Sequence, residues 1–188
     1  MTDTPAQSAG DAAVLAAMQA WLARAVIGLN LCPFAKAVQV RGQIRYTVSR
    51  ATDDAALLDT LAQELQVLHA CERQQWETTL LVLPEVLADF WEFNLFLKRA
   101  DHLLRQSGLE GVFQIASFHP DFEFGDAPAD DMGHFSNRAP YPTLHLLRED
   151  GIEEALASFP DAASIYERNL ATLRALGPQG WAALGVGP

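Results

Sequence analysis

The chain is poor in cysteine and lacks the signatures of several large enzyme classes. Its two cysteines, Cys32 and Cys71, form neither a CxxC pattern nor a Cys/His cluster. We therefore expect reduced thiols rather than a disulfide scaffold. No GxGxxG, P-loop, GxSxG or kinase signature occurs, so nucleotide-phosphate cradles and the serine-hydrolase elbow are not indicated.

A secretion signal and a membrane segment are also missing from the sequence pattern. No basic segment leads into an apolar run at the amino terminus, and no apolar stretch looks long enough to cross a bilayer. We therefore expect a cytoplasmic protein without a membrane partner.

Acidic residues are absent from one long stretch, although the chain as a whole is acidic. The net charge of −11 disfavours nucleic acid as a partner, because a phosphate backbone would be repelled. Residues 12–52 contain no Asp or Glu but several cations: Arg24, Lys36, Arg41, Arg45 and Arg50. Two interpretations are equally supported, a solvated basic edge or a site for a small anion.

An apolar content of 49% in 188 residues fits one globular domain. We expect a flexible amino terminus over residues 1–10, an α/β or α+β domain over 11–177 and a tail over 178–188. Helical periodicity and strand alternation predict these elements: a helix from Asp11 to Leu29, a strand at Ile44–Val48, a helix capped by Thr52 with a leucine stripe to Leu68, a strand at Thr78–Leu83, a helix from Glu85 to Ser107, strands at Val112–Phe118 and Thr143–Leu147, and a helix from Pro160-Asp161 to Leu176, ended by Gly177-Pro178.

This order predicts a mixed four-stranded sheet flanked by about five helices. Right-handed crossovers between neighbours would leave the first three strands parallel and the fourth antiparallel. The carboxyl ends of the first three strands, at Arg50, Glu85 and His119, would then share the edge where open α/β sheets bind ligands.

The segment Phe118–Arg148, FHPDFEFGDAPADDMGHFSNRAPYPTLHLLR, contains a long irregular loop with two of the segment's three histidines and its five carboxylates. Ordering such a loop costs backbone entropy that little apolar burial offsets, so long loops in compact domains usually have a function. We therefore look for the site here first.

His119 is the candidate catalytic residue of this loop, and Asp121 is its candidate partner. His119 ends a strand, Pro120 holds it extended, and Asp121 follows two residues after it. A histidine paired with a carboxylate suits general acid/base catalysis. The equally supported alternative is a histidine that satisfies backbone groups of the loop.

Arg138 is the candidate anion ligand, because a guanidinium suits fork-like binding of carboxylate or phosphate. Asn137, Tyr141 and Arg50 would join it at the same edge. The alternative is a structural Arg138 that pairs with Asp121, Glu123 or Asp131. His145, between two leucines of the fourth strand, is interpreted as a packed or sheet-face residue.

Metal and thiol chemistry are weaker alternatives. His119, Asp121 and His134 would be the ligands of a metal site, but no short-spaced zinc motif such as HExxH is present. Cys32 precedes Pro33 near a helix start and basic residues, which favours a thiolate, yet an unpaired cysteine is usually a small buried hydrophobe. We prefer the structural interpretation for Cys32 and expect it near the site. No cofactor is indicated.

Four phrases resemble one bacterial family in combination: GLNLCPFA (Gly28–Ala35), FHPDFEF (Phe118–Phe124), NRAPYPTLHLLRE (Asn137–Glu149) and IYERNLATLRALG (Ile165–Gly177). The chain resembles the family known as domain of unknown function 1415. The resemblance implies a single-domain bacterial protein and carries over no activity or catalytic residue.

The sequence therefore predicts a protein that binds a small anionic metabolite under the loop 119–142, with acid/base catalysis by His119 as an extension. Two alternatives stay open: a non-catalytic regulatory or protein-binding module, and a metal- or thiol-dependent enzyme. The ligand's identity and the oligomeric state are not indicated.

Overall fold

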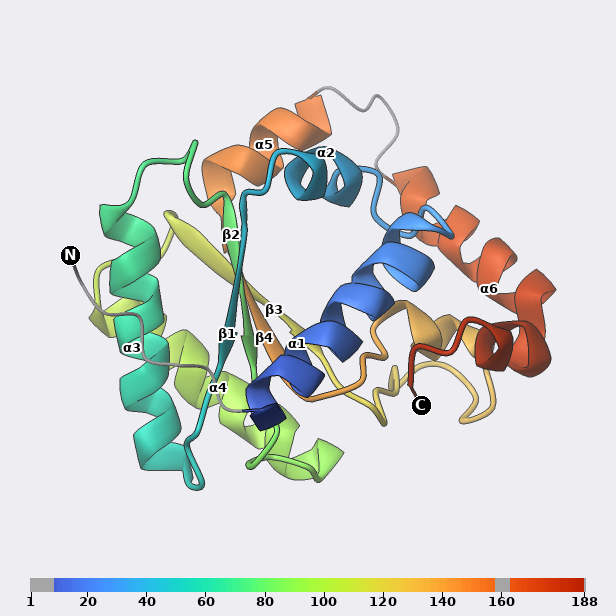
Figure 1. The fold of residues 1–188 in the computed structure, drawn as a ribbon, viewed down its shortest axis with the longest axis horizontal. Coiled ribbons are helices and arrows are strands. Elements are labelled where there is room, and N and C mark those ends of the chain that lie inside the picture. Colours follow the sequence, from blue (N-terminus) through green and yellow to red (C-terminus); the bar gives the residue numbers. More distant parts are fainter. Residues whose placement is uncertain (1–8, 158–162, 188) are drawn as a thin grey trace.

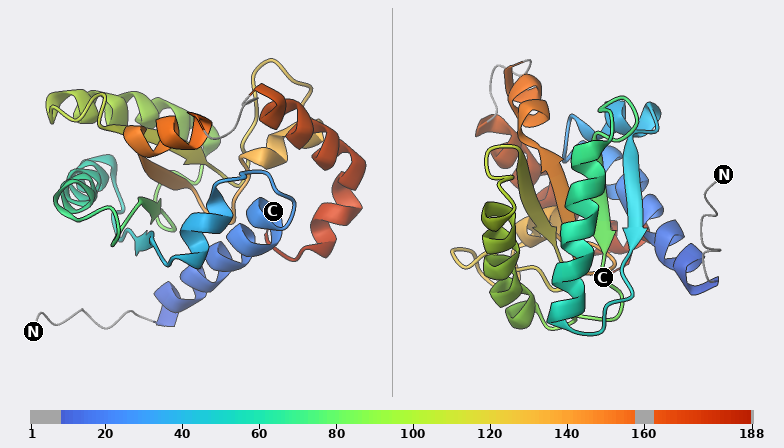
Figure 2. Two further views of the ribbon diagram at one scale, coloured as in Figure 1. Left: turned by 90° about the horizontal axis from the view of Figure 1, so that it is seen from above. Right: turned by 90° about the vertical axis from the view of Figure 1, so that its left-hand side faces the viewer.

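The computed structural model describes residues 9–157 and 163–187. Its elements in chain order are α1 (Ala9–Trp21), the π-helix η1 (Leu22–Ile27), α2 (Ala35–Val40), β1 (Ile44–Val48), α3 (Asp54–Ala70), β2 (Thr78–Val82), α4 (Phe90–Gln106), β3 (Phe113–Phe118), the 3-10 helix η2 (Met132–Ser136), β4 (Thr143–Arg148), α5 (Glu149–Ala157) and α6 (Ala163–Ala183). The helices α3 and α4 lie on one side of the sheet, and α1, α2 and α6 lie on the other (Figures 1 and 2). The predicted mixed α/β architecture is confirmed.

The strand order is β1-β2-β4-β3, which corrects the predicted topology. Only β1 and β2 pair in parallel, because β4 lies between β2 and β3 and is antiparallel to both. The prediction of three parallel strands assumed that consecutive strands become neighbours. Burial explains the observed order: all five residues of β2 are buried, and the apolar β4 joins it in the centre. The strands with polar residues, such as Arg45 and Gln114, form the edges.

Several element ends also differ from the predictions. Asp53 rather than Thr52 caps α3, and α4 begins at Phe90 behind its cap Asp89 instead of at Glu85. The helix α5 was not predicted, and none of its residues is buried. The predicted start of the last helix at Pro160-Asp161 lies outside the described residues.

The carboxyl-terminal segment is packed rather than loose. Gly177 has φ of 65° and turns the chain, but the helix resumes through Pro178 to Ala183. Trp181 and Val186 are each 4% exposed and join the core around α1. Of the predicted tail over residues 178–188, the part to residue 187 is described, and it belongs to the domain. Residues 1–8 lie outside the described part of the chain.

The first helix is long and apolar. Gly10–Ile27 meets the length and composition of a membrane span, so the expectation that no stretch reaches this length is wrong. The core helix of a globular protein meets the same criterion. Met18, Trp21 and Ala25 are buried among residues of the sheet and of α6, and 33% of the window Gly10–Ile27 is buried.

The strand β1 shows how alternation assigns side chains to the two faces. Ile44, Tyr46 and Val48 contact the core on the α1 side. Arg45 and Thr47 point to α3, where both bind the carboxylate of Glu64: Arg45 donates two hydrogen bonds of 2.8 and 3.1 Å, and Thr47 donates one of 3.1 Å. Glu64 is 7% exposed, so this group attaches an edge strand to a helix through a nearly buried charge.

We predict that Glu64→Ala lowers the free energy of unfolding by about 2–3 kcal/mol, because Arg45 and Thr47 lose a buried charged partner. Urea unfolding of the variant and of Gln66→Ala, an exposed position on the same helix, would measure the difference. The control should change stability by about 0.5 kcal/mol or less. Equal losses in both variants would contradict the role of Glu64.

Candidate ligand-binding site

The loop 119–142 contains the predicted catalytic histidine, and the structure uses its ring to hold main chain. His119 is fully buried between the rings of Phe90 and Phe93. Its Nδ1 accepts a hydrogen bond from the backbone N–H of Asp121 at 3.0 Å, so Nε2 carries the proton and donates to the carbonyl of Leu87 at 3.1 Å. Both ring nitrogens are thus occupied.

The bond to Leu87 stabilises a strained residue. Leu87 has φ of 59°, in the left-handed region that costs a bulky residue roughly 1–2 kcal/mol. Its carbonyl accepts the His119 proton in the turn before α4. Burial lowers the pKa of His119, which keeps the ring neutral for this arrangement.

His134 repeats the same pattern in the second half of the loop. Its Nδ1 accepts from the backbone N–H of Phe124 at 3.1 Å, and Nε2 donates to the carbonyl of Pro128 at 2.7 Å. Among the described residues, no group of three or more His, Cys, Asp and Glu side chains is placed to hold a metal ion. His119, Asp121 and His134 therefore do not come together as the ligand set considered from the sequence.

The predicted ligand-binding residues are also engaged in structural contacts. Arg138 stacks on Phe135, with 4.4 Å from its Cζ to the ring centroid, and its Nε donates to the carbonyl of Phe122 at 3.2 Å. Asp131, considered as its partner, pairs with Arg174 instead, at 2.6 Å.

The other three predicted ligands make contacts of the same kind. Asn137 donates to the carbonyl of Ser117 at 3.2 Å. Tyr141 is half-buried in the core around α1. Arg50 forms ion pairs with Asp11 and Glu85. The loop does bring His119 and Asn137 together, through a backbone bond of 3.1 Å, but their polar atoms already have partners. Catalysis by His119 and Asp121 stays a prediction that this geometry does not favour.

A pocket of about 700 Å³ lies elsewhere, on the face of the sheet that α3 and α4 leave free. Cross-strand rows of side chains form its floor. One row consists of Leu80, His145 and Ala116, and the next consists of Thr78, Leu147 and Gln114. The second row lies at the amino-terminal ends of β2 and β3 and the first row in their middle, whereas the prediction placed the site at the carboxyl-terminal edge.

The pocket's walls come from segments on both sides of this floor. Trp21, Leu22 and Val26 line one side, where the π-helix η1 continues α1. The turn 32–35 and α2 follow along the same wall, and Gly151, Ile152 and Ala155 of α5 complete the lining. Asn30 has φ of 56° in the turn after η1, and Asn169 of α6 donates to the carbonyl of Leu31 at 2.8 Å. These contacts fix the turn that carries Cys32 into the wall.

His145 is the polar group at the centre of the floor. Burial lowers its pKa to about 4, so the imidazole is neutral near pH 7. Among the described residues, no hydrogen bond to either ring nitrogen is formed, and the ring's aromatic neighbour is Phe118, at 6.0 Å between centroids. Ala116 lies directly opposite His145 in the ladder and leaves open space beside the ring. The neutral ring offers one donor and one acceptor to whatever enters the pocket.

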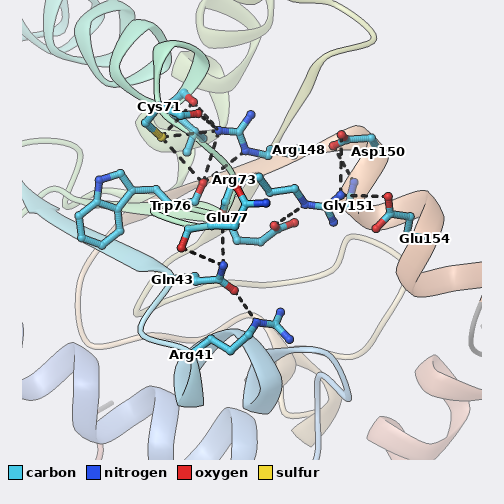
Figure 3. Close-up of polar contacts among 12 residues, drawn as sticks. Arg41, Gln43, Cys71, Arg73, Trp76, Glu77, Arg148, Asp150, Gly151 and Glu154 are labelled. Carbon is cyan, nitrogen blue, oxygen red and sulfur yellow. Dashed lines mark hydrogen bonds and ion pairs between the residues drawn. The ribbon is translucent and has the colours of Figure 1, made fainter.

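The rim between the start of β2 and α5 is a network of charged groups (Figure 3). Arg73 donates to Glu77 at 2.6 Å and to Glu154 at 3.0 Å, and it lies 3.9 Å from Asp150. Gly151 allows α5 to approach this network, because a Cβ at that position would lie 2.2 Å from Glu77 Oε1. The helix α5 has no buried residue of its own, and these contacts join it to the rim.

Arg41 and Gln43 form a second rim contact. The Arg41 Nε donates to the amide oxygen of Gln43, and the Gln43 amide nitrogen donates to the carbonyls of Arg73 and Gln74. Arg148, the third guanidinium in the lining, donates to the carbonyls of Leu68, Cys71 and Trp76 and so completes the carboxyl end of α3.

The sequence prediction placed Cys32 near a site formed with His119 and Arg138. Cys32 lines the pocket, and neither His119 nor Arg138 does. His145 was interpreted as a packed or sheet-face residue rather than a ligand, and the face on which it lies was not recognised as the floor of a pocket. The available signal was the alternation TLHLLR, which puts His145 on the same face as Leu147. Nothing in the sequence around Ala116 and Gln114 indicates that they line a pocket, because the pairing of β3 with β4 brings them there.

Comparison with known protein families supports the resemblance noted in the sequence. A family model described as a protein of unknown function, DUF1415, matches residues 13–183. The chain belongs to this family. No curated protein and no solved structure matches it. Three of the four family phrases contribute to the pocket: the first supplies the turn 32–35, the second Phe118, and the third His145 and Leu147.

We predict that His119→Ala destabilises the protein by about 2–4 kcal/mol at neutral pH, because it empties a buried site and leaves the Leu87 carbonyl unpaired. The native pKa lies below the unfolded value, so the unfolded state takes up the proton first as the pH falls. This contribution is therefore fully present above about pH 6.5 and is lost below it. Urea unfolding should show that the difference in free energy of unfolding between the wild type and His119→Ala becomes smaller from about pH 7.5 to about pH 5. His102→Ala, at an exposed position, is the control; a gap that widens in acid would contradict the assignment.

The rim network generates another prediction. Arg73→Gln should speed amide hydrogen exchange in residues 149–157 by roughly threefold to tenfold, because each lost partly exposed ion pair is worth about 1 kcal/mol or less. Exchange in β4 should stay unchanged. Arg99→Gln, which removes the exposed pair between α4 and Asp54, is the matched control. Unchanged exchange in α5 would show that other contacts hold this helix.

Proposed function

We propose that this protein binds a small, largely apolar molecule in the sheet-face pocket. The observation that carries the proposal is a hollow of about 700 Å³ whose floor presents a neutral imidazole, that of His145, without a hydrogen-bond partner among the described residues. The proposal keeps small-molecule binding as predicted from the sequence and moves the site from the loop to the pocket.

The pocket has the size and lining typical of ligand sites. Such sites are mostly apolar clefts of about 300–1,000 Å³ with a few polar groups that orient the ligand. Here the apolar surface comes from Leu80, Ile44, Trp21 and similar side chains. His145 and its diagonal neighbour Gln114 supply the polar groups on the floor. An apolar ligand would gain roughly 25 cal/mol for each Å² of apolar surface removed from water.

Binding is favoured over thiol chemistry by the same geometry. Cys32 and His145 line one pocket, which is the observation behind a thiol-dependent alternative. An activated thiol needs a base within hydrogen-bonding reach. No hydrogen bond joins these two side chains in the described structure, and the lowered pKa makes His145 a weak base.

The test is a thermal-shift measurement with 1-octanol and indole as apolar probes, on the wild type and on Ala116→Phe. The added ring should fill the space beside His145. At about ten times its dissociation constant, a probe should raise the wild-type melting temperature by about 3–5 °C and leave that of Ala116→Phe unchanged.

The control is Ala171→Phe, at an exposed position on α6, which should respond as the wild type does. If Ala116→Phe proves too unstable, Ala116→Leu gives a smaller filling. Absence of any shift in the wild type, or equal shifts in the filled variant, would rule out this pocket as the binding site.

A further inference from the structure

We infer that the ligand of this pocket is an amphiphilic monocarboxylate whose anionic end binds Arg41 while its apolar body covers the floor. This inference rests on the proposed function and adds the charge and chemical class of the ligand. The starting observation is that Arg41 lines the pocket and forms no ion pair among the described residues.

The other charged side chains of the lining already have partners. Arg73 binds Glu77 and Glu154, which uses the two lining carboxylates as well. Arg148 donates to the main-chain carbonyls at the end of α3. A cationic ligand would therefore find no unused carboxylate in the lining, whereas an anionic one finds the guanidinium of Arg41. Arg41, which has no ion-pair partner among the described residues, therefore favours a ligand with an anionic end.

Arg41 is positioned in advance by a buried amide. Gln43 is 8% exposed, and its amide nitrogen is fixed by two carbonyls, those of Arg73 and Gln74, at 3.2 and 3.1 Å. Its amide oxygen accepts from Arg41 Nε. The two terminal nitrogens of Arg41 remain for a ligand, and a guanidinium matches a carboxylate with two parallel hydrogen bonds. Because an exposed arginine is usually mobile, this support lowers the entropy cost of binding.

The surroundings of Arg41 favour an anion although the whole protein is acidic. The wall from Trp21 to Ile44 belongs to the stretch 12–52 that contains no Asp or Glu. The exposed guanidinium of Arg41 has no acidic residue in its own segment, and the lining carboxylates Glu77 and Glu154 bind Arg73 instead. The neutral His145 on the floor suits the uncharged body of the ligand, since burying the carboxylate there would be costly.

The experiment compares three probes with one apolar chain and different heads: octanoate, 1-octanol and octylammonium. Isothermal titration calorimetry on the wild type should give the tightest binding for octanoate, by about tenfold over 1-octanol, since one charge-assisted pair is worth roughly that factor. Octylammonium should bind more weakly than 1-octanol.

Variants then assign the selectivity to Arg41. Arg41→Gln should weaken octanoate binding by about tenfold and change 1-octanol binding by about twofold or less. Arg41→Lys keeps the positive charge but cannot form two parallel hydrogen bonds to a carboxylate. Its affinity for octanoate should therefore lie between those of the wild type and of Arg41→Gln. Lys36→Gln removes a nearby exposed charge that does not line the pocket, and it should leave both affinities unchanged.

The outcomes separate this inference from the proposed function. If 1-octanol binds but octanoate binds no tighter, or if Arg41→Gln leaves octanoate binding unchanged, the carboxylate assignment is wrong and the apolar pocket stands. If none of the three probes binds the wild type, both the assignment and the pocket's proposed function fail.

Discussion

The insertion of β4 between β2 and β3 is the constraint on which the rest of the structure depends. Antiparallel pairing on both sides of β4 fixes the register of the whole sheet. One face then carries Leu81, Leu144 and Leu146 into the core below α3 and α4. The opposite face brings Leu80, His145 and Ala116 into one row. A shift of β4 by one residue would turn its side chains to the opposite faces, His145 into the core and Leu144 and Leu146 out of it, and the pocket floor would not exist.

The long loop before β4 serves this same pairing. Its two histidines, His119 and His134, each join two main-chain groups through their two ring nitrogens, and Asn137 binds the end of β3 through both its side chain and its backbone. The entropy of ordering the loop is offset by these bonds and by aromatic packing around Phe90 and Phe122. The loop thereby delivers the chain to Thr143 in the register that β4 requires. The polar side chains of the loop thus form hydrogen bonds with its main chain, whether or not any of them also has a catalytic role.

The charge asymmetry of the sequence has a structural counterpart. The acid-free stretch 12–52 forms α1, the turn with Cys32, α2 and β1, and these segments build the wall of the pocket. Three of its five cations show two different roles. Arg45 binds Glu64 across the sheet and Arg50 binds Asp11 and Glu85, so their charges are neutralised within the fold. Arg41, held by Gln43, faces the pocket instead. Some cations of this stretch therefore stabilise the fold through ion pairs, whereas Arg41 is available to a ligand.

The sequence by itself determined the elements whose signals are local. Leucine spacing gives α3, and alternation gives β1 and the faces of β4, because these features depend on neighbours within a few residues. Family membership also followed from short phrases. Tertiary structure decided the strand order, the partners of His119 and the hollow above His145. Each of these depends on residues far apart in the chain, such as Ala116 opposite His145 or His119 against Leu87. Long-range pairing is selected by the burial of the whole sheet, and no local pattern in the sequence contains that information.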